Sequence, residues 1–303
     1  MCSLANCAIL SAERPVNDMP TLYVVATPIG NLSDLSPRVR ETLEKVDLVA
    51  AEDTRMAMKL LNHLGLSKPA VSCHRHNEES RASVIIERMI AENIDVALTC
   101  DAGTPAISDP GNRLVDAAWQ AGIRVVPVCG PSATVTALSA SGFDAREFVF
   151  YGFLPREKKP LVEKLEAIRA SGVPIAVVYE SPHRVVNLIE VIDKTLPGCN
   201  LAVCCDLTKL YEAIYRGTSA DVLEKMRANP NVEKGEYCLV IDLSPLPPLE
   251  KKSEALPADV IMLRAILDGA DLDEAANAAR EAGCPRNDIY RARLKIQSLF
   301  EEE

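Results

Sequence analysis

The sequence predicts an α/β protein made of two α/β domains and a small C-terminal helical region. From Thr21 onward, short runs rich in Val, Ile and Ala alternate with segments of helical period, which is the pattern of strands connected by helices. Near-continuous apolar strands are typical of a parallel sheet that helices cover on both faces. The length of 303 residues fits about two domains of roughly 150 residues each.

The first domain is expected over residues 21–146. It follows a loose extension at 1–20, which lacks the basic start and apolar core of a signal peptide. Ser36 before Pro37 is a typical helix start, and Gly65 is a typical helix stop. Strands of a parallel sheet are predicted at Leu22–Ile29, Asp47–Glu52, Ala70–His74, Val96–Asp101 and Val125–Cys129. Helices are predicted at Pro37–Lys45, Arg55–Leu64, Glu78–Glu92, Asn112–Ala121 and Ser132–Ser141.

The second domain is expected over residues 147–244. Several of its connections are too short for the crossovers that parallel neighbours need, so a mixed sheet is predicted. Its strands are expected at Phe148–Phe153, Pro174–Glu180, Leu201–Asp206, Ala213–Gly217 and Tyr237–Leu243. Its helices are expected at Lys159–Ala170, Pro182–Leu196 and Ser219–Ala228.

A linker is expected at 245–257, because Ser244–Pro257 contains four prolines in fourteen residues. The helical region at 258–303 follows it. Its three helices are predicted at Ala258–Leu267, Leu272–Glu281 and Asn287–Phe300.

The charge balance restricts the partners that the chain can bind. It carries 33 Lys and Arg against 43 Asp and Glu, a net charge of −10. An acidic chain is a poor nonspecific DNA-binding protein, so no DNA partner is expected, and RNA must meet a local basic patch. One segment, 285–297, has such an excess of basic residues. Its charged residues are Arg286, Asp288, Arg291, Arg293 and Lys295.

The cysteines indicate a cytoplasmic protein. The chain has ten of them, but no C-x-x-C pair, so their spacing is not that of zinc ligands. Free cysteines without a secretory signal are typical of a reducing compartment. No apolar run approaches the ~18 residues of a membrane-spanning helix, so no membrane partner is expected. Five cysteines are expected in strands as buried thiols: Cys100, Cys129, Cys204, Cys205 and Cys238.

Three loops at the predicted strand ends of the first domain are rich in Gly, Pro and small polar residues. They cover 27–32, 101–111 and 130–133. Such loops either form tight turns or let backbone N–H and C=O groups approach a ligand. Because ligands bind at the carboxyl ends of parallel strands, three such loops at one sheet edge favour a ligand site. The last loop also opens a helix, whose free N–H groups suit a carboxylate or phosphate.

Common nucleotide and nucleophile motifs are missing. The chain has no G-x-G-x-x-G after its first strand, no G-x-x-x-x-G-K-[ST] and no G-x-S-x-G. A Rossmann dinucleotide site, a P-loop and a nucleophile elbow are therefore not expected.

Seven motifs follow one another along the chain and carry a family resemblance. They are Thr27–Leu32, Ala51–Arg55, His74–Glu78, Asp101–Pro105, Gly152–Pro155, Tyr179–Arg184 and Thr208–Lys209. With them, the region from Thr21 to Ser244 resembles the bacterial 16S rRNA (cytidine-2′-O)-methyltransferases of the tetrapyrrole-methylase superfamily. Seven motifs in register are far more specific than any single one.

The resemblance implies a homodimeric enzyme with two α/β domains of the tetrapyrrole-methylase type. Such an enzyme uses S-adenosyl-L-methionine in the cleft between the domains. It methylates the 2′-oxygen of a cytidine in the decoding centre of 16S rRNA, within the small ribosomal subunit. The chain departs from the family pattern at two places. Cys129 replaces a usual proline, and Cys205–Asp206 replaces a usual Arg-Glu pair, which shortens the reach of the acid.

The candidate site residues divide into three groups. The cofactor-binding candidates come from the three loops: Pro28, Gly30, Asp101, Gly103, Thr104, Pro105, Ser132 and Ala133. The catalytic candidates are Lys209, Glu180 and Asp206. Glu180 and Lys209 are each expected at a strand end. A lysine beside a carboxylate is either a base, if burial lowers its pKa, or a structural ion-pair partner.

The RNA-binding candidates are Arg55, His76, Arg184, Arg291 and Lys295. Arg55 either binds a phosphate or pairs with Asp53. A metal at His74 and His76 would need Glu78 or Asp101 as a third ligand, and no metal is expected. Two other functions stay open: a tetrapyrrole (precorrin-type) C-methyltransferase and a non-enzymatic RNA-binding module. The basic C-terminal helix and the His74–Glu78 motif favour RNA.

Overall fold

A computed structural model describes residues 19–247 and 256–300. The chain divides into two compact units, Met1–Leu246 and Pro247–Glu303. The expected extension at 1–20 lies outside the described residues except for its last two, and most of the expected linker at 245–257 lies outside them as well.

The first sheet is parallel, as predicted. Its strands lie in the order β3-β2-β4-β1-β5, and every pairing between them is parallel. The strands are β1 (Thr21–Val25), β2 (Leu48–Ala51), β3 (Ala70–Ser72), β4 (Val96–Thr99) and β5 (Arg124–Val128). Because β1 lies between β4 and β5, the loops after these three strands meet at one edge of the sheet, as the sequence predicted.

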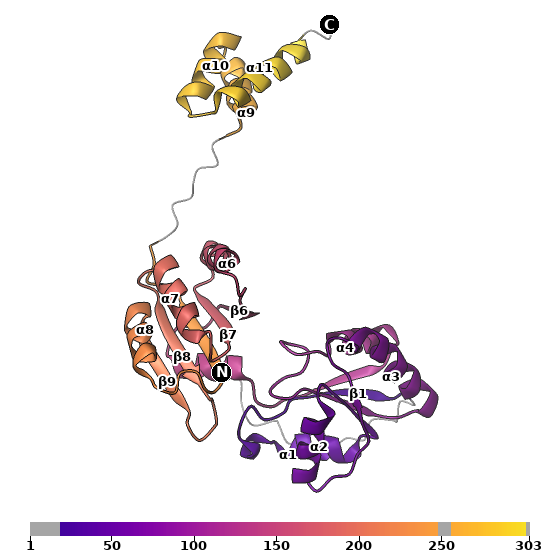
Figure 1. Cartoon of the computed structure of the whole chain (residues 1–303). Helices are drawn as coiled ribbons and strands as arrows, with labels where there is room; N and C mark the ends of the chain where they lie inside the picture. Colours follow the sequence, from indigo (N-terminus) through magenta and orange to yellow (C-terminus); the bar gives the residue numbers. More distant parts are fainter. Residues whose placement is uncertain (1–18, 248–255, 301–303) are drawn as a thin grey trace, which may run out of the picture. The chain divides into compact units, whose positions relative to one another are not determined.

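Helices cover both faces of this sheet (Figure 1). One apolar cluster packs α1 and α2 against it, and another packs α3 and α4 against the opposite face. The bounds are α1 (Pro37–Lys45), α2 (Thr54–His63), α3 (Glu78–Glu92) and α4 (Asn112–Gln120). The start of α1 follows the sequence signal, since the Ser36 hydroxyl accepts a hydrogen bond from the N–H of Val39 and Pro37 occupies the first turn.

The second sheet is mixed, as expected from its short connections. Its order is β6-β7-β10-β8-β9, with β6 and β7 parallel and the other pairs antiparallel. The strands are β6 (Phe148–Phe153), β7 (Ile175–Glu180), β8 (Asn200–Cys205), β9 (Ala213–Thr218) and β10 (Tyr237–Asp242).

Four helices enclose the second sheet. Three of them pack on one face: α6 (Lys158–Ala170), α7 (Val185–Thr195) and α8 (Ser219–Ala228). The other face receives α5 (Ala133–Ser141), which leads out of the first sheet and buries Ala137 and Leu138 against β7, β8 and β10. The second sheet therefore shares an apolar cluster with α5 and with Ile29 of the loop after β1.

The C-terminal unit has an apolar core of its own. Its helices are α9 (Ala258–Leu267), α10 (Leu272–Glu281) and α11 (Arg286–Phe300). Met262 and Ile296 are almost fully buried in it together with alanines of α10. Asp271 caps α10 in a capping box with Glu274. Three helices of this length bury a small but complete core.

Three sequence expectations need correction. β1 ends at Val25 instead of Ile29, because Thr27 leaves the sheet ladder and pairs with Gly103 instead. α7 begins at Val185 instead of Pro182, since residues 181–184 form a turn before it. Cys129 follows the end of β5 and is exposed, whereas Cys100, Cys204, Cys205 and Cys238 are buried as expected.

Candidate active site

A cavity of about 740 Å³ lies between the loops of the first sheet and the second sheet, on the face of the second sheet against which α5 packs. Its volume is within the ~300–1,000 Å³ usual for small-molecule sites. The loops after β4 and β5 form one wall, with Gly103, Thr104, Ser132 and Ala133 lining it. Four of the eight predicted cofactor-binding residues thus line the cavity. Pro28, Gly30, Asp101 and Pro105 are not among its lining residues.

Gly103 holds the loop after β4 in its unusual path. Its φ angle is +84°, a conformation that side chains other than glycine rarely adopt. Its N–H donates to the carbonyl of Thr27 at 3.0 Å, and its carbonyl accepts from the N–H of Thr27 at 2.8 Å. The Thr104 hydroxyl donates to the carbonyl of Pro131 at 3.4 Å. The three small-residue loops are therefore bonded to one another.

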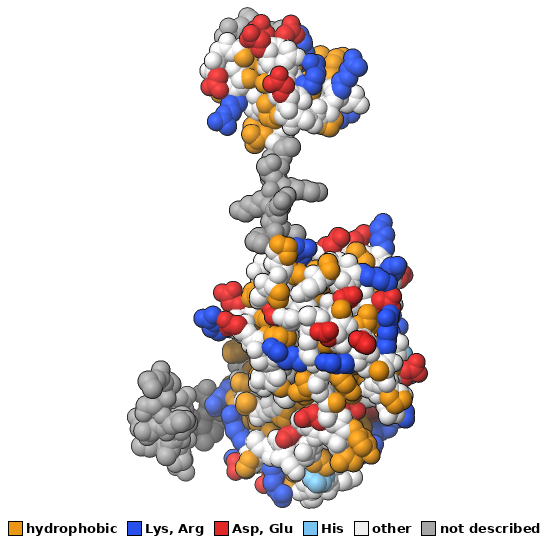
Figure 2. All heavy atoms as spheres, turned by 90° about the vertical axis from the view of Figure 1, so that its left-hand side faces the viewer, with side chains coloured by type: hydrophobic (Ala, Val, Ile, Leu, Met, Phe, Trp, Pro, Cys, Tyr) orange, Lys and Arg blue, Asp and Glu red, His pale blue; other side chains and the backbone are white. Residues whose placement is uncertain are grey.

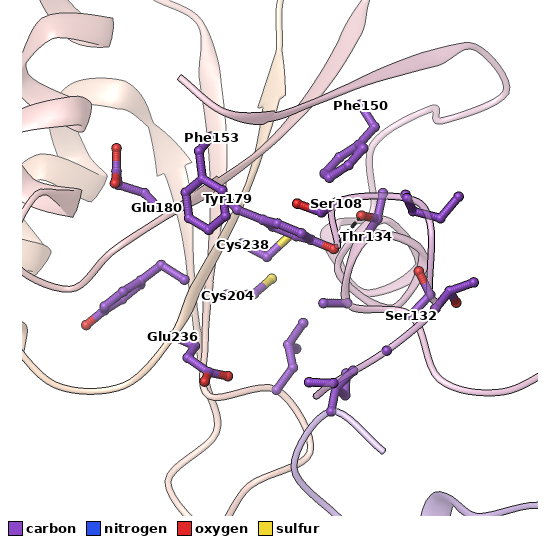
Figure 3. A pocket seen from close by; sticks show the side chains of 18 of the residues that line it. Ser108, Ser132, Thr134, Phe150, Phe153, Tyr179, Glu180, Cys204, Glu236 and Cys238 are labelled. Carbon is purple, nitrogen blue, oxygen red and sulfur yellow. Dashed lines mark hydrogen bonds between the residues drawn. The ribbon is translucent and has the colours of Figure 1, made fainter. Parts of the chain in front are cut away.

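The start of α5 faces the cavity. Ser132 is the N-cap residue, in an extended backbone conformation, and its side chain makes no capping bond. The first N–H groups of α5 are thus available for a ligand. The Thr134 hydroxyl lies 2.8 Å from that of Tyr179, which links α5 to β7 across the cavity (Figure 3).

The second sheet contributes an aromatic wall. Phe150 and Phe153 each contact the Tyr179 ring edge-to-face, with centroid distances of 4.9 and 5.8 Å. Two residues three positions apart in a strand normally face opposite ways. Here a bulge lets Tyr151 drop out of the register between Phe150 and Gly152, so both phenylalanines lie on the cavity side. Cys204 and Cys238, direct neighbours across two strands, line the cavity beside them (Figure 3).

Glu180 ends β7, as predicted, and lines the cavity wall. Its side chain is fully buried, and one carboxylate oxygen lies 3.1 Å from the Arg184 guanidinium. The other accepts the N–H of Ser181 at 2.7 Å, while Arg184 donates to the carbonyl of Pro155. The structure thus brings two predicted site residues, Glu180 and Arg184, into one ion pair.

Lys209 lies in the loop after β8, not at a strand end as expected. Its ammonium group donates to Asp206 at 3.0 Å and to Glu236 at 2.9 Å. Burial alone would lower the pKa of Lys209, but the bonds to Glu236 and Asp206 outweigh it and raise the pKa. The lowered pKa that a lysine base requires is therefore not found. The lysine is a cation at neutral pH.

Gly30 and Asp206 fix the position of this lysine loop. A Cβ at Gly30 would lie 2.5 Å from the Lys209 side chain, so glycine permits the first-sheet loop to touch the loop after β8. Asp206 has a φ angle of +49°, which Asp tolerates better than most residues. The short acid at 206 therefore fits a left-handed turn.

A second cavity of about 680 Å³ adjoins the first. Both cavities are lined by Ile107, Ser108, Asp109, Phe150 and Phe153. The residues that line only the second are Glu52, His74, Arg75, His76, Pro110, Tyr151 and Gly152. Among the RNA-binding candidates, His76 lies here. Three residues of the motif His74–Glu78 therefore line the second cavity: His74, Arg75 and His76.

Three carboxylates repel one another near the second cavity: Asp109, which lines both cavities, Glu52, which lines only the second, and Asp101, which lines neither. Burial, and next the charges of Asp109 and Asp101, raise the pKa of Glu52. Burial and the neighbouring Asp101 likewise raise the pKa of Asp109. Burial also raises the pKa of Asp101, whose carboxylate accepts the N–H of Asp53 at 3.2 Å. Perturbed carboxyl groups beside a cavity are a common mark of functional sites.

Glu78 supports the loop that both cavities share. It is buried, and one of its oxygens accepts the N–H groups of Gly111 at 2.8 Å and Arg113 at 2.7 Å. It therefore caps the N-terminus of α4, and these two hydrogen bonds hold its carboxylate there. Over residues 19–247 and 256–300, no three His, Cys, Asp or Glu side chains gather to form a metal site.

The remaining basic candidates are not among the residues that line either cavity. Arg55 pairs with Asp53, one of the two interpretations of the sequence, and this bond lowers the pKa of Asp53 to about 2. In the C-terminal unit, Lys295 pairs with Asp259 at 2.8 Å. Arg291 is exposed on α11.

Sequence reasoning missed the aromatic wall and the three carboxylates near the second cavity. Phe150 and Phe153 were expected as ordinary strand residues. The one available signal was Gly152, since glycine inside a strand often marks a bulge. Asp109 stands in the loop that was singled out, but its raised pKa comes first from burial and then from the charge of Asp101, and both depend on the fold.

Comparison with known proteins now identifies the family. The family model of tetrapyrrole (corrin/porphyrin) methylases matches residues 21–223. "Ribosomal RNA small subunit methyltransferase I" of Halalkalibacterium halodurans is 40% identical over 277 residues, covering 90% of this chain and 94% of that protein. The protein of the same name from Escherichia coli O157:H7 is 38% identical over 284 residues, covering 93% and 97%. The chain belongs to this family. The resemblance seen in the seven motifs is thereby confirmed.

Two solved structures share the fold of this rRNA small subunit methyltransferase I family member. Diphthine synthase gives a TM-score of 0.58 at 16% identity, covering 73% of this chain and 89% of that one. The methyltransferase CobJ gives 0.55 at 17% identity, covering 74% and 94%. At these identities the likeness shows the fold alone. The predicted two-sheet architecture of tetrapyrrole-methylase type is confirmed.

Proposed function

We propose that the protein methylates the 2′-oxygen of a cytidine ribose in the decoding centre of 16S rRNA, with S-adenosylmethionine as methyl donor. The observation that carries the proposal is the 740 Å³ cavity on the bonded small-residue loops, in a chain of the rRNA small subunit methyltransferase I family. The substrate named for its relatives supports the RNA target.

The first cavity fits the proposed donor. Apolar Ile29 and Leu207 suit the adenine ring and the hydrocarbon parts of the donor. The N–H groups at Ser132 and Ala133 suit its carboxylate, because the N-terminus of α5 favours an anion there. The backbone at Gly103 and Thr104 suits its polar ribose. When bound, the donor supplies an electrophilic methyl group on a sulfonium.

The proposed roles of the three catalytic candidates follow from their partners. Lys209 is a cation tied to two carboxylates, so we assign it a role in charge placement beside the acceptor RNA instead of proton abstraction. Asp206 holds that lysine. Glu180 faces the first cavity, and its pairing with Arg184 makes it a positioning residue for the turn at 181–184.

The decisive experiment is calorimetric binding of S-adenosylmethionine followed by methyl transfer. Small ribosomal subunits that lack the modification, naked 16S rRNA and a tetrapyrrole macrocycle serve as acceptors. We expect binding of the donor and methylation of a cytidine in the RNA. Methylation of the macrocycle alone would favour a tetrapyrrole C-methyltransferase. Binding of RNA without any donor binding would favour a non-enzymatic RNA-binding module.

Replacing Gly103 by valine is expected to lower donor affinity at least about tenfold, since holding a residue other than glycine in the left-handed region costs roughly 1–3 kcal/mol. A Cβ there would meet only ordinary contacts, so the effect comes from the displaced backbone. Gly65→Val is the matched control, because Gly65 has a similar φ of +71° and lies outside the cavity. Equal donor affinity in both folded variants would contradict this assignment.

Partner, assembly and compartment remain proposals. The resemblance supports a homodimer, which light scattering of the purified protein tests. A cytoplasmic location agrees with the ribosomal substrate proposed here. Over the described ranges, no helix has the length and apolar character needed to cross a membrane. Arg55 and Arg291, both exposed, and Lys295, exposed though paired with Asp259, stay candidates for contacts to RNA phosphates.

A further inference from the structure

The second cavity opens beside the proposed donor cavity and has seven lining residues that the donor cavity lacks. The shared wall consists of the loop residues Ile107, Ser108 and Asp109 together with Phe150 and Phe153. Figure 3 shows Ser108, Phe150 and Phe153 projecting into the region where α5 faces β7. A group bound in the second cavity therefore lies next to whatever occupies the first.

The chemistry of the second cavity matches a nucleotide unit. Arg75 presents an exposed guanidinium that is oriented by a 3.0 Å bond to the carbonyl of Ser108. His74 and His76 stand beside it, with ring centroids 6.1 Å apart. A guanidinium that keeps free donors is suited to phosphate. In a chain of net charge −10, this basic group lies in a concave site instead of on an open face.

The carboxylates in the second cavity disfavour a bare anion as its ligand and favour a nucleoside. Glu52 and Asp109 both line it, and each would repel an isolated phosphate. A carboxylate accepts hydrogen bonds from ribose hydroxyl groups and from the amino group of cytosine, the usual partner of Glu and Asp among bases. One cation with two carboxylates therefore fits a cytidine phosphate better than it fits an inorganic anion.

Phe153 completes the site as a surface for a base. Its side chain remains 61% exposed although it is large and apolar. An aromatic face left in water beside a basic group is the usual platform on which single-stranded RNA bases stack. The β6 bulge is what turns this ring toward the cavities.

We infer, on the basis of the methyl transfer proposed above, that the second cavity binds the acceptor nucleotide. Arg75 holds its phosphate, Phe153 its base, and Asp109 its reacting 2′-hydroxyl. Asp109 is placed for the last role because it lines both cavities. In the transfer, the hydroxyl oxygen forms a bond to the methyl carbon and the carbon–sulfur bond breaks. Its electron pair stays on sulfur, and the hydroxyl proton passes to the Asp109 carboxylate.

Arg75→Gln tests the inference, with methylation of unmodified small ribosomal subunits and calorimetric binding of S-adenosylmethionine measured side by side. We expect kcat/KM for the subunits to fall about 10- to 100-fold, the effect of one charge-assisted phosphate contact, mainly through KM. Donor affinity should stay at the wild-type value. Arg75→Lys should recover part of kcat/KM because it restores the charge without the guanidinium fork.

Arg88→Gln is the matched control, since Arg88 lies on α3 in a surface pair with Glu92 and lines neither cavity. It should leave both readouts unchanged. Wild-type kcat/KM in folded Arg75→Gln would overturn the inference, as would an equal loss of donor affinity and kcat/KM. A wild-type protein that binds no donor or methylates no RNA would instead overturn the proposed function.

Discussion

Arg184→Met is expected to lower the free energy of unfolding by about 3 kcal/mol, the low end of the cost of breaking a buried ion pair. The reason is that Glu180 has a side chain with no exposed surface, and it would lose its counter-ion. The variant also loses the bond from Arg184 to the carbonyl of Pro155. Urea or guanidinium denaturation at neutral pH measures the difference.

Two comparisons make that result specific. Arg146→Met breaks the pair between Arg146 and Asp144, whose side chains are 87% and 62% exposed, and it should change stability far less than Arg184→Met, because water screens an exposed pair. The double variant with Glu180→Leu and Arg184→Met should recover most of the lost stability, because no buried charge is left unpaired. A small effect of Arg184→Met alone would show that solvent compensates Glu180.

Asp109→Asn is expected to lower turnover by about 10²- to 10⁴-fold, the usual contribution of a general base, with donor affinity retained. It should also raise the melting temperature at pH 7. Burial and the charge of Asp101 raise the pKa of Asp109 above its ordinary 3.8. The folded state therefore holds the protonated form more strongly, and stability falls as the pH rises through the raised pKa. Asparagine does not ionise, so the variant does not lose stability as the pH rises.

The melting temperatures of the wild type and Asp109→Asn, measured as a function of pH, test this prediction. The stability advantage of Asp109→Asn should be full at pH 7 and should shrink as the pH falls toward 4, where the wild-type carboxyl becomes protonated. Asp116→Asn, an exposed change on α4, should alter neither turnover nor melting. Wild-type turnover in Asp109→Asn would place the proton acceptor elsewhere.

Local signals predicted the elements well, and their ends less well. The bounds of α1 and α3 agree with the sequence, because Ser36, Pro37 and the left-handed Asn93 mark them chemically. The end of β1 was overextended, since the apolar run continues after Val25 while the backbone turns to pair with Gly103. The hydrophobic pattern indicates which residues are buried. Residues such as Ala26 and Ile29 are still buried after the last hydrogen bond between β1 and its neighbours.

The lining of the first cavity was predictable where glycine and small polar residues mark a loop at a strand end, as at Gly103 and Ser132. The pKa values of the site residues were not predictable, because they depend on neighbouring charges that the fold brings close. The pKa of Lys209 depends on Glu236, which is 27 residues away and meets it only because β8 and β10 pair. The raised pKa of Asp109 likewise comes first from burial and then from the charge of Asp101. Such pairings follow from tertiary register, which a single sequence does not reveal.

The extra residue in β6 bears on how this fold can change over generations. Phe148, Phe150 and Phe153 all line the donor cavity, while Tyr151 and Gly152, at the bulge, line only the second. Deleting the extra residue would restore the regular alternation of the strand and turn Phe153 to the opposite face, away from the donor cavity. The length of β6 is therefore fixed by the donor side, whereas the side chain at Tyr151 can vary with the acceptor, and a substitution library at position 151 would explore that freedom directly.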